Sequence, residues 1–174
     1  MSVIYFDGVN VHYDSIVAYE SQESECEKVV KLCDPKTNRT LTVCTVGHWG
    51  LGRLCTDFIE ENFEKFKRNK KSVLADVELR SISEKKKESF ECFIVDSHSP
   101  HIWMFDDGMG VWGKVPRQSF IIGHPRAVAV TAIMAAKGVK AVKKAWKDLE
   151  ESHYYYDKVT REPYLTLKAI HTEA

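Results

Sequence analysis

The chain has 174 residues, of which 44% are apolar and 29% charged, a composition that fits one globular domain with its own core. Its 25 basic and 25 acidic residues give a formal net charge of zero, which argues against nucleic acid or an anionic membrane as partner. No apolar run approaches the roughly 20 residues that span a bilayer, and the amino terminus has no signal-peptide pattern, so we expect a cytoplasmic protein.

The first part of the chain is predicted to form strands and then one long helix. Asp7-Gly8 is typical of a tight hairpin turn, and residues 20–25 are polar and predicted to be a loop. Apolar residues from Leu51 to Phe66 recur at helical spacing, and the basic run 65–71 then ends the helix as a solvated patch. The predicted strands cover residues 2–6, 9–15, 26–33 and 41–46.

The second part is predicted to be a β-meander, two helices and a final strand pair. Pro125 stands at the favoured first position of a helix whose segment 127–136 is almost wholly apolar, and Gly138 separates it from a second, amphipathic helix over 139–149. Residues 73–82 fit a short helix or a strand equally well. The predicted strands are 90–96, 102–105, 111–115 and 119–122 in the meander, then 153–157 paired with 164–168.

This order of elements predicts an α+β fold in which helices pack outside two antiparallel sheets. No linker or repeat divides the chain, so we expect a single domain over residues 1–174. The five cysteines are scattered without a CxxC pair, which is typical of reduced thiols in a cytoplasmic protein. His98 and His101 offer two metal ligands without a clear third, so we expect no metal and no cofactor.

The amino terminus carries the first chemical signal. Ser2 is small, so we expect an aminopeptidase to remove Met1 and leave a serine with both a hydroxyl and a free α-amine. Such an amine has an ordinary pKa of about 7.7–8.0 and can act as a general base near neutral pH. Nucleophile and base would then lie on one residue. If Met1 is retained, this mechanism is blocked.

Taken in order, the segments resemble the proteasome β-subunit family, and most closely the bacterial HslV-type proteases. The matching pieces are the returning strand that ends in Asp14-Ser15, the lysine-bearing segment 26–32, the strand and glycine of 41–47 before a helix, and the apolar strand and turn of 120–124 before an alanine-rich helix. The resemblance implies a four-layer αββα sandwich, the N-terminal-nucleophile hydrolase fold.

The resemblance also implies roles for four residues. Ser2 stands at the position of the family's nucleophilic threonine, and Lys28 at the cation that lowers the pKa of the attacking hydroxyl and of the amine. Asp14 stands at the residue that orients this lysine, and Gly47 at the backbone donor of the oxyanion hole. The alternatives are an ordinary ion pair between Asp14 and Lys28, and a simple turn at Gly47.

Two histidines are candidates for the substrate pocket. His48 follows the proposed oxyanion glycine, and its alternative is a surface-loop histidine. His124 stands where the family has a small hydroxyl residue in a Gly-Ser turn, and its alternative is a residue at a helix N-terminus without a chemical role. The chain also departs from the family in using serine for threonine as nucleophile and in having no glycine in the segment 150–152.

The resemblance implies a peptidase that cleaves peptides or unfolded proteins inside a homo-oligomeric ring or related assembly, with an ATP-dependent unfoldase as a possible partner. A catalytically inactive assembly or binding subunit of the same fold is the main alternative. An amide hydrolase of the same superfamily that acts on small amides is a third.

Overall fold

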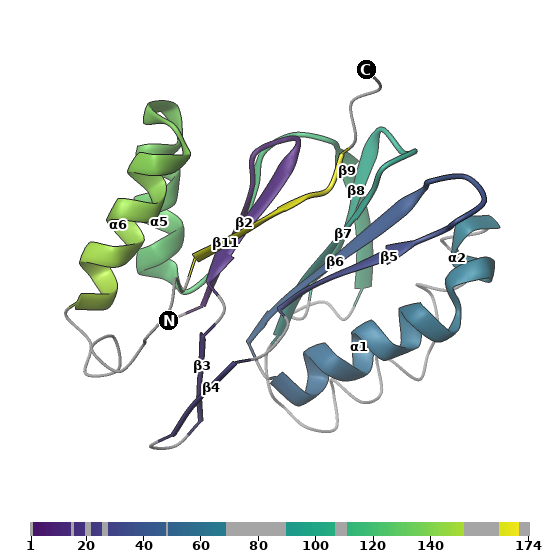
Figure 1. Ribbon diagram of the computed structural model, residues 1–174, viewed down its shortest axis with the longest axis horizontal. Coiled ribbons are helices and arrows are strands. Elements are labelled where there is room, and N and C mark those ends of the chain that lie inside the picture. Colours follow the sequence, from purple (N-terminus) through teal and green to yellow (C-terminus); the bar gives the residue numbers. More distant parts are fainter. Residues whose placement is uncertain are drawn as a thin grey trace. The chain divides into compact units, whose positions relative to one another are not determined.

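In the computed structural model, the described residues are 2–14, 16–19, 22–25, 28–47, 49–68, 90–106, 111–151 and 164–170. The chain divides into two compact units. The first unit comprises Met1–Lys28 and Gln118–Ala174, and the second comprises Val29–Arg117. Figure 1 shows helices and antiparallel strands in both, so the predicted α+β class is confirmed.

The first unit contains a four-stranded antiparallel sheet in the order β10-β1-β2-β11. Strands β1 and β2 form the predicted hairpin, in which the Asp7 backbone N–H donates to the Asn10 carbonyl over 3.0 Å and Gly8 has a φ of 103°. The strands of this sheet are β1 (Val3–Phe6), β2 (Asn10–Asp14), β10 (Phe120–Gly123) and β11 (Tyr164–Lys168).

Two helices pack on this sheet, as the sequence predicted. They are α5 (Pro125–Met134), continued by a short 3-10 helix (Ala135–Lys137), and α6 (Val139–Glu151). Their shared apolar cluster consists of Val3, Tyr5, Ala127, Val142, Trp146 and Tyr164. On β1 the other two residues, Ile4 and Phe6, are also fully buried, so both faces of this strand are covered.

The second unit contains a five-stranded antiparallel sheet in the order β5-β6-β7-β8-β9. Its strands are β5 (Val29–Cys33), β6 (Thr40–Gly47), β7 (Phe90–Asp96), β8 (His101–Asp106) and β9 (Val111–Pro116). Helices α1 (Trp49–Glu61) and α2 (Phe63–Arg68) follow β6. Helix α1 lies close to this sheet at Gly52, where an added Cβ would come within 2.9 Å of Thr45 Oγ1.

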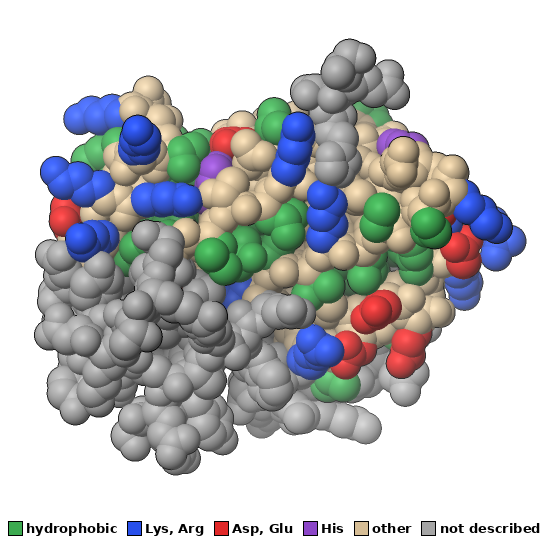
Figure 2. Space-filling model, in the orientation of Figure 1, with side chains coloured by type: hydrophobic (Ala, Val, Ile, Leu, Met, Phe, Trp, Pro, Cys, Tyr) green, Lys and Arg blue, Asp and Glu red, His purple; other side chains and the backbone are tan. Residues whose placement is uncertain are grey.

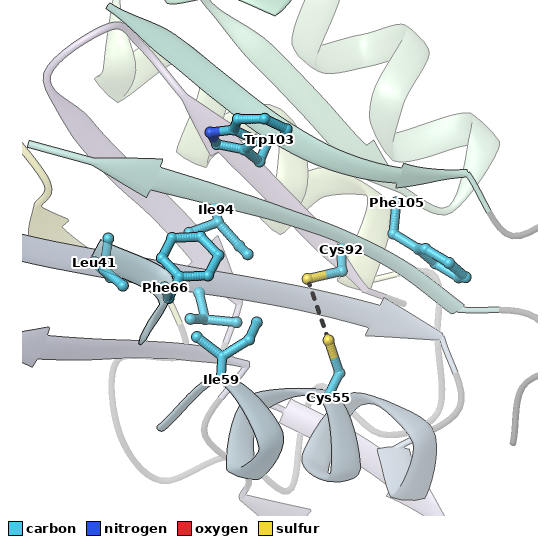
Figure 3. Close-up of a cluster of buried hydrophobic side chains, with 9 residues drawn as sticks. Leu41, Cys55, Ile59, Phe66, Cys92, Ile94, Trp103 and Phe105 are labelled. Atoms are coloured by element: carbon cyan, nitrogen blue, oxygen red, sulfur yellow. Dashed lines mark hydrogen bonds between the residues drawn. The ribbon is translucent and has the colours of Figure 1, made fainter. Parts of the chain in front are cut away.

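The core of the second unit lies between α1, α2 and the sheet. Figure 3 shows Ile59 and Phe66 pointing toward Leu41 and Ile94, and the Cys55 and Cys92 sulfurs lie 3.9 Å apart. The buried cluster comprises Leu41, Val43, Cys55, Ile59, Phe66, Cys92, Ile94, Trp103 and Phe105. Here too the opposite face of the sheet is buried, because Phe93 and Val95 alternate with cluster residues along β7 and are fully covered.

Several predicted elements differ from the structure. The predicted loop 20–25 contains strand β4 (Gln22–Glu25), which pairs with β3 (Ile16–Tyr19) in a separate two-stranded sheet. Strand β10 does not extend the meander but pairs with β1. Strand β11 pairs with β2, and the expected partner 153–157 lies outside the described residues, as do 73–82.

The predicted single helix is interrupted at Asn62, whose side-chain amide donates to the Phe58 carbonyl over 2.9 Å. Within the basic run, Lys65 and Arg68 are exposed as predicted, but Lys67 is less solvated. The Lys67 side chain is only 12% exposed because its ammonium binds Asp34 and lies 4.9 Å from the centre of the Phe63 ring. None of the described helices combines the length and the apolar content needed to cross a bilayer.

Candidate active site

The amino-terminal end of β1 lies against the end of β10. Ser2, half-buried, precedes β1, and its carbonyl oxygen accepts a hydrogen bond of 2.8 Å from the His124 backbone N–H. Val3 pairs with Gly123, which has a φ of 135°. A Cβ on Gly123 would lie only 2.2 Å from the Ser2 carbonyl oxygen, so this close approach requires glycine.

Asp14 connects the start of β1 to Lys28. Its carboxylate is 1% exposed, and Oδ1 accepts a hydrogen bond of 2.8 Å from the Val3 backbone N–H. The other oxygen, Oδ2, lies 2.7 Å from Lys28 Nζ. Because the Val3 nitrogen is bonded to the carbonyl carbon of Ser2, Asp14 is anchored one peptide bond from the candidate nucleophile and holds Lys28 with its other oxygen.

Lys28 immediately precedes β5 and is only 4% exposed. A buried ammonium and a buried carboxylate each lose hydration, so each needs the other as a partner. A cation held near a hydroxyl favours the deprotonated form of that hydroxyl, and it disfavours a second positive charge on a neighbouring amine. The structure thus brings together two charged residues that the sequence proposed for catalysis, Asp14 and Lys28, beside the residue that follows Ser2.

Gly47 ends β6 in the second unit and has a φ of 102°. This left-handed conformation favours glycine and lets the chain leave the strand shortly before α1 begins at Trp49. The ordinary turn proposed as an alternative for Gly47 therefore has a local structural basis. His48, the first of the two pocket candidates, lies outside the described residues.

His124, the second pocket candidate, is the exposed N-cap residue of α5. Its Nδ1 accepts a hydrogen bond of 3.3 Å from the Arg126 backbone N–H, and this bond satisfies one of the free amides at the helix start. This geometry agrees with the alternative of a helix N-terminal residue. The backbone N–H of His124 contacts Ser2.

Sequence reasoning missed the role of Gly123 and the bond from Val3 to Asp14. The glycine had a legible signal, since it stands between a strand and a proline that opens a helix, where a backbone with positive φ is common. The bond to Val3 had none, because it depends on how β1 and β2 align side by side.

Comparison with solved structures finds the same fold in other proteins. A Gly-1 mutant of Anbu from Hyphomicrobium sp. strain MC1 superposes with a TM-score of 0.68 at 14% sequence identity, covering 96% of this chain and 80% of that one. The chain has the Anbu fold. The helical assembly of the Anbu complex from Pseudomonas aeruginosa gives a TM-score of 0.67 at 10% identity, over 97% of this chain and 80% of its own.

HslV has the same fold. The eukaryotic HslV of Trypanosoma brucei gives a TM-score of 0.59 at 13% identity and covers 98% of this chain and 99% of its own. Neither a protein-family model nor a curated protein matches the chain in sequence. The predicted resemblance to HslV is thus confirmed as a likeness of fold to HslV and Anbu, which leaves the chemistry to be argued from this chain's own residues.

Proposed function

We propose that this chain is a proteasome-type peptidase subunit that cleaves peptide bonds through Ser2 after removal of Met1. The observation that carries the proposal is the buried Asp14 carboxylate, which holds the Val3 N–H with one oxygen and the Lys28 ammonium with the other. Asp14 thereby holds a buried cation near the start of β1, and a cation near an N-terminal nucleophile lowers the pKa of its hydroxyl and of its amine. The likeness of fold to HslV supports the same activity.

In the proposed mechanism, Ser2 Oγ attacks the peptide carbonyl and its own α-amine accepts the hydroxyl proton. Lys28 lowers the pKa of both groups, and Asp14 keeps Lys28 in position. The amine then passes the proton to the leaving amine, and water releases the acyl group from Ser2. Gly47 supplies the backbone donor for the oxyanion, a contribution of about 2.7–4 kcal/mol to the transition state, while His48 and His124 border the substrate.

This function calls for a finer architecture than the two units show separately. We propose that the chain forms one domain over 1–174, in which the two sheets stack face to face between two helical layers. Both sheets support this four-layer sandwich, because each has one buried face packed on helices and a second buried face, represented by Phe6 and Phe93.

The proposed enzyme is a cytoplasmic homo-oligomer, in a ring or a related assembly, that takes peptides or unfolded proteins as substrate, with an ATP-dependent unfoldase as a possible partner. One similar protein, the Anbu complex of Pseudomonas aeruginosa, forms a helical assembly, which supports self-association here. The near-neutral net charge also permits close packing of identical subunits.

The test is intact-mass spectrometry before and after treatment with a covalent inhibitor of N-terminal nucleophiles, combined with peptidase assays. We expect a chain that begins at Ser2 and gains one inhibitor adduct on that residue. Ser2→Ala should abolish peptide hydrolysis without unfolding the protein, whereas Ser2→Thr should retain it. Ser119→Ala, at an exposed serine of the same unit, is the matched control. Unchanged hydrolysis by Ser2→Ala excludes the nucleophile assignment.

The second candidate function is a catalytically inactive assembly or binding subunit. The observation that favours it is the His124 side chain. It caps a helix at the position where the resemblance to the proteasome family implies a small hydroxyl residue. An intact mass that includes Met1, together with self-association and no inhibitor adduct, would establish this alternative. Turnover of small amides without turnover of peptides would instead indicate another amide hydrolase.

A further inference from the structure

A second group of hydrogen-bonded side chains lies in the first unit, at the turn-proximal half of β2. Asp7 Oδ2 lies 2.7 Å from His12 Nε2, and His12 Nδ1 lies 2.8 Å from Thr166 Oγ1. Asp7 comes from the β1–β2 turn, His12 from β2 and Thr166 from β11. Carboxylate, imidazole and hydroxyl thus follow one another in the order of an acid–base–nucleophile triad, a constellation recognised by geometry rather than by position in the sequence.

The proton positions in this group follow from what each partner can do. An ionised carboxylate only accepts, so in the neutral ring His12 Nε2 carries the proton and Nδ1 accepts from the Thr166 hydroxyl. Asp7 is fixed by the Val9 and Asn10 backbone N–H groups, which donate to Oδ1 over 2.9 and 2.7 Å. Partial burial raises the pKa of Asp7, but the hydrogen bonds from Asn10 and His12 lower it overall and keep the carboxylate ionised.

A lysine completes the surroundings of the hydroxyl. Lys143 Nζ donates to Thr166 Oγ1 over 2.9 Å. Because an ammonium can only donate, the hydroxyl keeps its own proton for His12. A cation at this distance also stabilises negative charge that develops on the oxygen or on a bound carbonyl. Thr166 therefore has a base on one side and a positive charge on the other.

Thr166 is an exposed residue, whereas its base is buried. Thr166 is exposed on β11, the last strand in the order of its sheet, whereas the His12 side chain is only 3% exposed. Lys and Arg side chains gather over α5 and α6 (Figure 2), and Lys140 and Lys147 share a helix face with Lys143. This positive surface favours a leaving group that departs as an anion.

The hydrogen-bonded group Asp7–His12–Thr166 is called the relay below, and the pairing of β11 with β2 does not explain it. The backbone register already places Thr166 opposite His12, within a ladder of five paired residues from Tyr164 to Lys168. An apolar cross-strand pair would serve that ladder equally well. The chain of hydrogen bonds from Asp7 through His12 to the hydroxyl of an exposed threonine is what a nucleophile requires.

We propose that Thr166 is a self-acylating hydroxyl that takes an acyl group from small activated esters. In this step Thr166 Oγ1 attacks the carbonyl carbon of the donor and its proton moves to His12 Nδ1. The bond from the acyl carbon to the leaving oxygen then breaks, and the leaving group departs as an anion. His12 finally returns its proton to water, so the products are the threonine ester and the released anion. This step is independent of Ser2.

The experiment uses p-nitrophenyl acetate as donor, with residue-by-residue peptide mapping of the full chain. We expect an acetyl ester on Thr166 that forms at least about 100-fold faster than on the exposed Ser119, within the range that a general base contributes. Alkaline hydroxylamine should remove this ester and leave acetyl-lysine intact, which distinguishes it from acetylation of Lys143. The same label should form in Ser2→Ala, so this experiment can succeed or fail independently of the proposed peptidase activity.

Asp7→Asn separates the relay from a structural contact. The amide can still accept the Val9 and Asn10 N–H groups, but its NH2 group donates to His12 Nε2 and forces the proton onto Nδ1. We expect the ester on Thr166 to fall about 100-fold, and ¹⁵N NMR of His12 to report the exchanged tautomer. Thr166→Ser should retain acetylation at this position, and Thr166→Val should lose it.

Two outcomes of the acetylation experiments would overturn the proposal. One is acetylation of Thr166 no faster than that of Ser119 in the wild-type chain. The other is a folded Asp7→Asn variant with the exchanged His12 tautomer and an unchanged rate. If Asp7→Asn does not fold, the wild-type rate and the ¹⁵N signal of His12 Nδ1 still decide, because a protonated Nδ1 is incompatible with the proposed base.

Discussion

The Trp146 indole N–H donates a hydrogen bond of 2.8 Å to the Thr131 hydroxyl, inside the apolar cluster of the first unit. Thr131 in turn donates to the Ala127 carbonyl over 2.6 Å, so its hydroxyl is used in both directions. Trp146 is fully buried on α6 and Thr131 on α5. This contact fixes the two helices against each other at one defined point.

We therefore expect Thr131→Val to destabilise the protein by about 1–3 kcal/mol, because the buried indole N–H loses its acceptor while the side-chain volume is kept. Urea denaturation gives the free energy of unfolding. Thr131→Ser retains the hydroxyl and should recover most of the loss. Equal destabilisation by both variants would contradict the assignment of the loss to the hydrogen bond.

Gly123 should tolerate no side chain. An added Cβ would lie 2.2 Å from the Ser2 carbonyl oxygen and 2.8 Å from the Val3 Cα. Both are backbone atoms, so neither can move aside as a flexible side chain could. Strain at positive φ costs about 1–3 kcal/mol, and overpacking costs a similar amount. We expect Gly123→Ala to lower the free energy of unfolding by at least about 2 kcal/mol, as measured by urea denaturation.

Gly113→Ala is the matched control, because nothing lies within 4 Å of the Cβ that it would add. We expect the free energy of unfolding of this variant to lie within about 0.5 kcal/mol of the wild-type value. Equal effects of the two alanines would contradict a specific close approach of β10 to Ser2. Circular dichroism of Gly123→Ala would show whether the loss is global.

Much of the fold was predictable because periodicity and turn residues report directly on local structure. Asp7-Gly8 predicted the first hairpin, and Pro125 and Gly138 predicted where α5 begins and where α6 is separated from it. Strand pairing was not predictable in the same way. Strand β10 follows the meander in sequence but pairs with β1, since adjacency along the chain does not fix which sheet edge a strand joins.

The Asp34–Lys67 pair gives a prediction for pH. The Lys67 ammonium and then the Lys36 backbone N–H lower the pKa of Asp34 to about 2. An aspartate whose pKa is lower in the folded state than its unfolded value of about 3.9 stabilises the fold above that value. This stabilisation is lost as pH falls from about 4 toward 2. The urea midpoint should therefore fall with acidification more steeply in the wild type than in Asp34→Asn.

Glu64→Gln is the control for this prediction. Glu64 also contacts Lys67, at 2.9 Å, but its side chain is 75% exposed, so solvent screens the interaction. We expect its pH dependence to match that of the wild type. If Asp34→Asn shows the wild-type slope between pH 4 and 2, another carboxylate accounts for the acid sensitivity.

The candidate site was predictable in its residue types but not in its contacts. The resemblance to a family proposed Asp14 and Lys28, and the structure pairs them at 2.7 Å. The second oxygen of Asp14 and its bond to Val3 depend on strand register, which is set by the whole sheet. The relay from Asp7 to Thr166 joins residues more than 150 positions apart, and no local pattern links them.

The buried Asp14–Lys28 pair provides the last prediction. Lys28→Met removes the cation and leaves a buried carboxylate without its charged partner, which typically costs about 3–5 kcal/mol. Asp14→Asn similarly removes the carboxylate that pairs with the ammonium, although the amide oxygen can still accept the Val3 N–H. In the double variant neither charge remains, so we expect its loss of unfolding free energy to be clearly smaller than the sum of the two single losses. Urea denaturation of all four proteins measures this coupling. Additive losses would show that the two charges do not stabilise each other, and Asp14 would then not be the residue that holds Lys28 for the proposed chemistry at Ser2.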